Sequence, residues 1–236
     1  MNIPSPPQLS SWRLVRELAG LGRAAGLLLH APSLARLPRG GGAPVLVLPG
    51  YGAGDASTLP LRSFLALLGY RVRGWGLGRN RGNVRALIPR VTELVATRAS
   101  AEGRPLRLVG WSLGGYLARE AARERPADVA SVVTLGAPVV GGPKYTALAE
   151  AYRRHGHDLD AIEAAGAARD RVPIMVPITA IYTRRDGVVA WQACIDRVSP
   201  HVEHVEVRST HLGLGVDAEV YRIVALHLAR NRSTSA

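Results

Sequence analysis

A serine between two glycines has the setting in this sequence that best suits covalent catalysis. The motif GlyTrpSerLeuGly at 110–114 ends the apolar run 106–110 and precedes a helical pattern. A turn from strand to helix holds such a serine in a strained backbone conformation, and the flanking glycines leave room where a Cβ would collide. A glycine-rich chain can contain this motif by chance, so the motif alone does not identify a nucleophile. Its position between a strand and a helix is the evidence for that role. We therefore predict that Ser112 is a nucleophile.

A base and an acid follow the serine in the order that such chemistry requires. A hydroxyl becomes a nucleophile when a histidine takes its proton, and a carboxylate must hold that histidine in the correct tautomer. Asp186 follows the apolar run 178–183, and His211 follows the run 202–207. Residues at the carboxyl ends of parallel strands meet at one edge of a sheet. We predict a triad of Ser112, Asp186 and His211 for acyl transfer, which needs no metal and no organic cofactor.

Other acids and histidines fit these roles less well. We expect Asp217 to cap the last helix and Asp196 to be a charge on a helix surface. A cluster of metal-ligating side chains lies on a polar helical stretch, where solvated surface is the expected outcome: His155, His157, Asp158 and Asp160. The glycine-rich loops at 50–55 and 74–78 match neither of the phosphate-binding motifs GxxxxGK(S/T) and GxGxxG with its acidic partner.

The elements that must position the triad are a set of parallel strands, and the chain from residue 44 predicts them. Short apolar or β-branched runs alternate with amphipathic stretches, which is typical of βαβ units. We expect strands at 44–48, 70–75, 106–110, 129–135, 178–183 and 202–207, and helices at 58–68, 83–100, 113–123 and 217–230. The predicted fold class is α/β, with a mostly parallel sheet of about six strands and helices on both faces.

The chain of 236 residues suits one α/β domain, which we place at 44–230. Residues 139–173 interrupt the alternation and are expected to form a small helical cap over the carboxyl ends of the strands. Residues 1–43 form an N-terminal helical segment and linker, with an apolar stripe of Leu14, Leu18, Leu21, Ala25 and Leu28. That stripe predicts a helix docked on the core or an interfacial helix in peripheral contact with a membrane. We favour docking, since Gly20, Gly22 and Gly26 weaken an isolated helix.

The charge of the chain does not indicate nucleic-acid binding. The formal net charge is +12, but Lys144 is the only lysine and the arginines are scattered along the sequence with no recognition motif around them. Cys194 is the only cysteine, so an intramolecular disulfide and a cysteine-ligated zinc are excluded. Ser33, Leu34 and Ala35 resemble a signal cleavage site, yet no cationic region precedes Arg13. We expect a cytoplasmic protein.

The motifs together resemble the α/β-hydrolase superfamily, and within it the bacterial serine esterases and lipases, over roughly residues 44–230. The resemblance rests on four segments: LeuProGlyTyrGly at 48–52, GlyTrpSerLeuGlyGly at 110–115, TyrThrArgArgAspGlyValVal at 182–189 and SerThrHisLeuGlyLeuGly at 209–215. In that family two backbone N–H groups bind the oxyanion, and the resemblance implies those of Tyr51 and Leu113. The chain departs from many lipases in having Pro49 before the loop glycine and Trp111 before the serine, where those have histidine.

The triad and the resemblance predict a serine hydrolase that cleaves a small-molecule or lipid ester through an acyl-enzyme on Ser112. The alternatives are an acyltransferase or other chemistry with the same triad, and a non-catalytic binding protein on this scaffold. Trp75, Trp111 and Trp191 each lie near a strand end, and we expect them to line an apolar acyl pocket or to pack in the core. The sequence does not indicate the acyl length or the oligomeric state.

Overall fold

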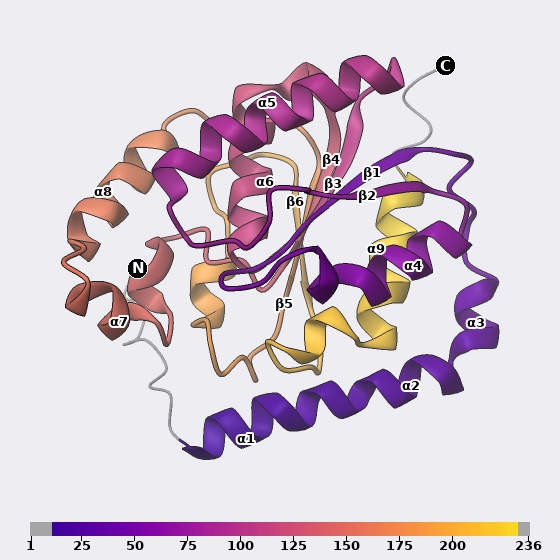
Figure 1. Cartoon of the computed structure of the whole chain (residues 1–236), viewed down its shortest axis with the longest axis horizontal. Coiled ribbons are helices and arrows are strands. Elements are labelled where there is room, and N and C mark those ends of the chain that lie inside the picture. Colours follow the sequence, from indigo (N-terminus) through magenta and orange to yellow (C-terminus); the bar gives the residue numbers. More distant parts are fainter. Residues whose placement is uncertain (1–10, 231–236) are drawn as a thin grey trace.

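Six strands form one sheet in which every neighbouring pair is parallel. The computed structural model describes residues 11–230, with side chains from residue 15 onward. The strands are β1 (Pro44–Leu48), β2 (Arg71–Gly74), β3 (Leu106–Trp111), β4 (Val129–Leu135), β5 (Ile178–Tyr182) and β6 (Val202–Glu206). Their order is β2-β1-β3-β4-β5-β6, so the direction of winding reverses between β1 and β3 (Figure 1). Ligands bind at this switch point in open α/β sheets.

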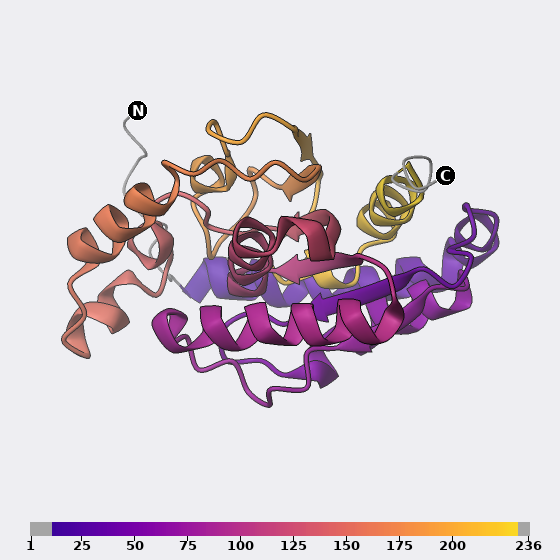
Figure 2. The ribbon, with the colours of Figure 1, turned by 90° about the horizontal axis from the view of Figure 1, so that it is seen from above.

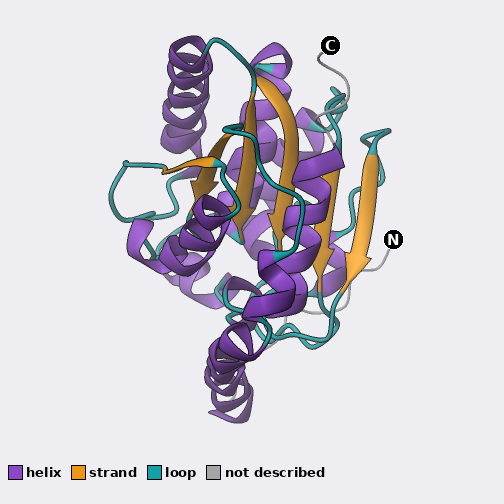
Figure 3. Ribbon diagram, turned by 90° about the vertical axis from the view of Figure 1, so that its right-hand side faces the viewer, coloured by secondary structure: helices purple, strands orange, loops and turns teal. Residues whose placement is uncertain are grey.

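The burial of the strands follows their place in the sheet. Every residue of β1 is buried, and β3 and β4 are buried along nearly their whole length, because helices cover both faces (Figure 3). The edge strands β2 and β6 contain only exposed and half-buried residues. Continuous apolar runs therefore mark the central strands, and charged residues mark the edges.

Helices cover the two faces of the sheet and extend beyond it (Figure 2). They are α1 (Ser11–Gly20), α2 (Ala24–Leu29), α3 (Ala31–Ala35), α4 (Leu59–Leu67), α5 (Val84–Glu102), α6 (Leu113–Glu124), α7 (Ala149–Arg154), α8 (Leu159–Arg169) and α9 (Ala218–Arg230). One core joins α4 and α9 to alternate strand residues such as Val45 and Val47, and the other joins α5 and α6 to Leu46 and Leu48. Alternate residues of β1 thus feed opposite cores, as the period of a strand requires.

The predicted six-stranded α/β fold is confirmed, and the sheet is wholly parallel. The N-terminal segment contacts the domain, as the favoured expectation has it, but not through its apolar stripe. It is divided among α1, α2 and α3, and its apolar stripe faces away from the domain: Leu18 is 51% exposed and Leu28 80% exposed. The opposite side of α1 contacts the domain through Glu17 and Gly20. The carboxylate of Glu17 accepts hydrogen bonds from loop N–H groups, and Gly20 has no side chain and so lets the helix approach Thr210 closely. The side chain of Leu14 lies outside the described part of the chain.

The segment expected as a cap contains α7 and α8 and is fixed to α6 by ion pairs. Arg169 on α8 pairs with Glu120 on α6, and Asp170 pairs with Arg123 at 2.8 Å. These partly buried pairs join the segment to the helix that begins at the predicted nucleophile. Among the residues that the structure describes, no helix is both long enough and apolar enough to cross a bilayer.

Candidate active site

Ser112 lies in a sharp turn between β3 and α6. Its φ of 53° makes it the one non-glycine residue with a positive φ among residues 11–230. The turn is tight because a Cβ on Gly110 would lie 2.4 Å from the carbonyl oxygen of Gly114, and a Cβ on Gly114 would lie 2.4 Å from that of Leu48. Glycine is therefore required on both sides, and Ser112 is held in a conformation that side chains rarely adopt.

Substituting Ser112 with Gly should stabilise the protein, since the strain belongs to the side chain at this backbone conformation. A strained φ/ψ costs about 1–3 kcal/mol, and the extra freedom of glycine in the unfolded chain offsets about 0.4–1 kcal/mol of the relief. We expect Ser112→Gly to unfold in urea with a free energy about 1 kcal/mol larger than that of Ser112→Ala, which retains a Cβ. Equal stabilities of the two variants would show that the turn is not strained.

Asp186 and His211 form a buried pair in the loops after β5 and β6. The Nδ1 of His211 lies 2.7 Å from Oδ2 of Asp186. The other oxygen, Oδ1, accepts hydrogen bonds from the N–H groups of Val188 and Val189 at 2.8 and 2.7 Å, which fixes the carboxylate. Because Nδ1 donates to the carboxylate, Nε2 is left free to accept a proton.

The end of β4 brings the serine to this pair. The N–H of Ser112 donates to the carbonyl oxygen of Leu135 at 2.7 Å. The next residue, Gly136, has a φ of 57°, and a Cβ there would lie 3.0 Å from Nδ1 of His211 and 3.2 Å from Oδ2 of Asp186. Leu135 and Gly136 therefore adjoin all three predicted triad members, which lie at the same edge of the sheet.

The surroundings of His211 raise its pKa. Burial alone would lower the pKa, but the charge of Asp186, its hydrogen bond and the charge of Glu17 outweigh that effect. The carboxylates thus stabilise the imidazolium that forms when the histidine takes a proton, as a general base requires.

The loop after β1 lies against the nucleophile and offers an N–H group beside it. A Cβ on Gly50 would lie 3.3 Å from the Cβ of Ser112. The backbone N–H groups of Tyr51 and Leu113 donate to no acceptor within residues 11–230. Buried Asn80 fixes the loop by two hydrogen bonds. Its side-chain amide donates to the carbonyl of Pro49 at 3.0 Å, and its backbone carbonyl accepts the N–H of Gly52 at 2.7 Å. The sequence analysis missed Asn80, because its partners lie far along the chain.

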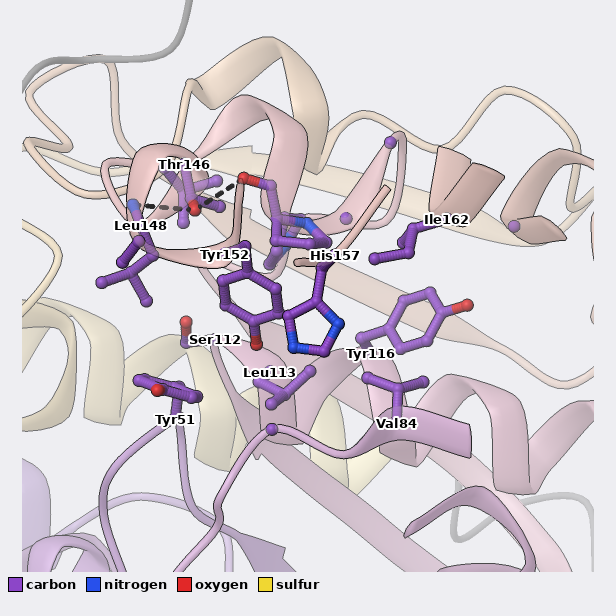
Figure 4. A pocket seen from close by; sticks show the side chains of 18 of the residues that line it. Tyr51, Val84, Ser112, Leu113, Tyr116, Thr146, Leu148, Tyr152, His157 and Ile162 are labelled. Atoms are coloured by element: carbon purple, nitrogen blue, oxygen red, sulfur yellow. Dashed lines mark hydrogen bonds between the residues drawn. The ribbon is translucent and has the colours of Figure 1, made fainter. Parts of the chain in front are cut away.

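A cleft of about 560 Å³ opens beside Ser112, between the core and the cap segment. Figure 4 shows the Ser112 hydroxyl near Tyr51 and Tyr152, with His157 and Ile162 farther along the cleft. Apolar side chains form much of the remaining wall: Val84, Leu113, Val139, Leu148, Val188 and Val189. A largely apolar cleft of this size with a few polar groups is typical of a site for a small molecule.

None of the three tryptophans expected as pocket residues lines this cleft. Trp75 is fully buried in the core and donates to the carbonyl of Gly78 at 2.9 Å. Trp111 donates to the carbonyl of His211 at 3.2 Å, and the ring of Trp191 stacks on that of Tyr182. Packing, the alternative to the expected pocket, therefore describes all three tryptophans, and the indole N–H is bonded to backbone in Trp75 and Trp111.

Polar residues of the cap and of the loop before β6 have roles that the sequence analysis did not predict. His155 and His157 are exposed, as expected of a solvated surface, and they also line the cleft with Tyr152. The spacing of Tyr152 and His155, which puts them on one helical face, was the signal for this. Asp196 was expected on a surface, yet it is buried in an ion pair with Arg119 at 2.7 Å. Within residues 11–230 no three His, Cys, Asp or Glu side chains gather as metal ligands would.

Comparisons with known proteins find similarity in structure only. No family model and no curated sequence matches the chain. A metagenome-derived lipolytic enzyme is 20% identical, with a TM-score of 0.60 over 83% of this chain and 96% of its own. A monoacylglycerol lipase from Paleococcus ferrophilus is 14% identical, with a TM-score of 0.60 over 83% and 97%. The mouse α/β-hydrolase domain-containing protein 10 is 18% identical, with a TM-score of 0.55 over 79% and 88%.

Proposed function

We propose that this chain, which has the α/β-hydrolase fold, hydrolyses carboxylic esters through an acyl-enzyme on Ser112. The observation that carries the proposal is the strained serine turn next to a buried Asp186–His211 pair, at the mouth of an apolar cleft. Named structural neighbours include lipolytic enzymes, which supports ester substrates as the first class to test. A binding protein would gain nothing from a strained serine beside an oriented base.

The proposed reaction uses only groups of this chain. Nε2 of His211 takes the proton of the Ser112 hydroxyl, and the oxygen attacks the ester carbonyl carbon. The N–H groups of Tyr51 and Leu113 donate to the oxyanion of the tetrahedral intermediate. Its collapse breaks the ester bond, and the imidazolium gives its proton to the departing alcohol. Water then attacks the acyl-enzyme, with the same histidine as base, and releases the acid and the free serine.

The cleft favours esters with an acyl group of small to medium size. Its walls are mainly aliphatic and aromatic, so they suit an apolar acyl chain, and a volume of about 560 Å³ lies within the range for small-molecule sites. Two exposed arginines, Arg81 and Arg85, and the two histidines add polar groups to the lining. We therefore expect soluble esters to be better substrates than long-chain fats.

The experiment that tests the proposal combines an ester panel with a covalent probe. Hydrolysis of p-nitrophenyl esters from acetate to palmitate gives the preferred acyl length. A fluorophosphonate reacts only with an activated serine, and mass spectrometry of the labelled peptide should place the adduct on Ser112. A chain that cleaves no ester of the panel and takes up no probe would reject the proposal in favour of a binding protein.

The pH dependence of the reaction should reflect the raised pKa of His211. The neutral imidazole is the base, so kcat/KM should fall as the pH falls through this pKa. Because the pKa lies above the ordinary value of 6.5, the loss should begin at a higher pH than for an ordinary histidine. The measurement is kcat/KM across a pH series with a short-chain ester. Full activity at about one pH unit below 6.5 would contradict a raised pKa.

A further inference from the structure

Helix α1 reaches the two loops that carry the acid and the base. In Figure 1, α1 lies along the bottom of the view, below the sheet. The side chain of Glu17 on this helix is almost fully buried, in a residue only 1% exposed. Its Oε1 accepts the N–H of Gly187 at 2.7 Å, and its Oε2 accepts the N–H of Leu212 at 2.8 Å. Gly187 directly follows Asp186, and Leu212 directly follows His211.

We propose that Glu17 is a positioning residue for the proposed reaction, and that its carboxylate ties the acid loop to the base loop at the spacing of the Asp186–His211 hydrogen bond. The inference rests on the proposed function for its catalytic meaning. Each oxygen holds the backbone one residue beyond a triad member, so any change in Glu17 is passed to both loops. The N-terminal helix thereby becomes part of the active-site framework.

The packing around Glu17 leaves no room for a different arrangement. A Cβ on Gly187 would lie 2.8 Å from Oε1 of Glu17, so the loop backbone touches the carboxylate. One turn further along the helix, a Cβ on Gly20 would lie 2.0 Å from the hydroxyl of Thr210, which precedes His211. The backbone of helix α1 therefore contacts the base loop directly, and this contact fixes the position of Glu17.

The two contacts require a carboxylate. Both partners are N–H donors, and an ionised carboxylate offers an acceptor at each oxygen. A glutamine in the same place offers one oxygen and one NH₂ group, so one of the two loop amides would face another donor. A buried amide without an acceptor costs about 1–3 kcal/mol, which favours movement of that loop.

The charge of Glu17 also acts on the base. It raises the pKa of His211, in addition to the larger effect of Asp186. The charged groups on the elements packed around His211 include Glu17 of α1, Arg23 of the turn after α1, Asp186 after β5 and Asp217 before α9. The other arginines of α1 and of the two loops are exposed to solvent: Arg16, Arg184, Arg185 and Arg208. Arg23 and Asp217 pair with each other at 2.8 Å, so their charges offset one another. Glu17 is thus the second negative charge that sustains the imidazolium.

The test compares Glu17→Gln with Arg23→Gln, which removes another contact between the N-terminal segment and the domain. Glu17 does not line the cleft, so Glu17→Gln should leave KM within about twofold while kcat falls about 10- to 100-fold. The acid limb of kcat/KM should move to lower pH, because a negative charge near His211 is lost. Arg23→Gln should change kcat by no more than about twofold, and it should not move the limb to lower pH, because it removes a positive charge and leaves Asp217 unpaired.

A readout without substrate separates this inference from the proposed function. Titration of the His211 ring by NMR, assigned with His211→Gln, should show a lower pKa in Glu17→Gln than in the wild type, even if no ester is cleaved. If Glu17→Gln does not fold, Gly20→Ala serves instead, since it pushes α1 from Thr210 and keeps the charge, and it should lower kcat with KM unchanged. Equal kcat and equal His211 titration in the wild type and the variants would overturn the inference.

Discussion

Replacing Ser112 with Ala should lower kcat for ester hydrolysis by about 10⁴- to 10⁶-fold, which is the range for loss of the nucleophile in triad enzymes. Alanine lacks the oxygen that forms the acyl-enzyme, so only the N–H groups of Tyr51 and Leu113 and binding in the cleft remain to assist water. Alanine keeps the Cβ, and the backbone strain at φ 53° is therefore unchanged. The free energy of unfolding should match that of the wild type, and the loss will report on chemistry.

The matched control for this variant is Ser100→Ala, which removes an exposed hydroxyl from α5. It should retain the wild-type kcat and the fluorophosphonate labelling, whereas Ser112→Ala should lose both. Initial rates with the best p-nitrophenyl ester, measured on samples of equal purity, give the comparison. A Ser112→Ala variant with more than about a hundredth of the wild-type kcat would show that another group performs the reaction.

The sheet could be predicted because the residue types of each strand indicate how deeply the strand is buried. The run PVLVL of β1 is apolar at every position, which only a strand covered on both faces needs. The ends of elements were less predictable. Strand β2 was expected to run to residue 75, but the N–H groups of Trp75 and Gly76 donate to the carboxylate of Asp55 at 2.9 and 3.0 Å and leave the ladder. A contact across twenty residues decides that end.

The triad could be predicted for a topological reason, and the cleft could not. Ser112, Asp186 and His211 each follow a strand, and parallel strands bring their carboxyl ends together whatever the packing. The cleft depends on how the cap lies over those ends. The sequence pattern does not determine how side chains such as Tyr152 and Trp191 pack there. The tryptophans were assigned to a pocket or to the core because each lies near a strand end, and the N–H groups of Trp75 and Trp111 bind backbone acceptors away from the cleft.

The role of Glu17 was missed because the apolar stripe of the N-terminal segment dominated its interpretation. That stripe is exposed, with Leu18 at 51%, and the buried face carries a carboxylate that a hydrophobic pattern treats as solvated. A single glutamate between Arg16 and Leu18 gives no sign of its partners, which lie at Gly187 and Leu212. Hydrogen bonds from backbone N–H groups leave no trace in side-chain patterning.

Replacing Asp186 with Asn should lower kcat by about 10⁴-fold, the size of this change in other triads, while the fold is kept. The loop dictates the orientation of the new amide. The N–H groups of Val188 and Val189 both point at the position of Oδ1, so the asparagine oxygen must lie there and its NH₂ group must face His211. Nδ1 of the imidazole then has to accept, its proton moves to Nε2, and the ring can no longer take the proton of Ser112.

Asp196→Asn is the matched control, because Asp196 is held in the same way. Its Oδ1 accepts the N–H groups of Val198 and Ser199 at 2.8 and 3.1 Å, and its Oδ2 accepts a hydrogen bond from Arg119. Asparagine there disrupts a buried ion pair, so it should reduce the free energy of unfolding by about 3 kcal/mol or more and leave kcat near the wild-type value. Asp186→Asn should do the reverse, with a large loss of kcat and a small loss of stability. Comparable loss of kcat in both variants would mean that Asp186 matters for folding, and that the tautomer of His211 is set by another group.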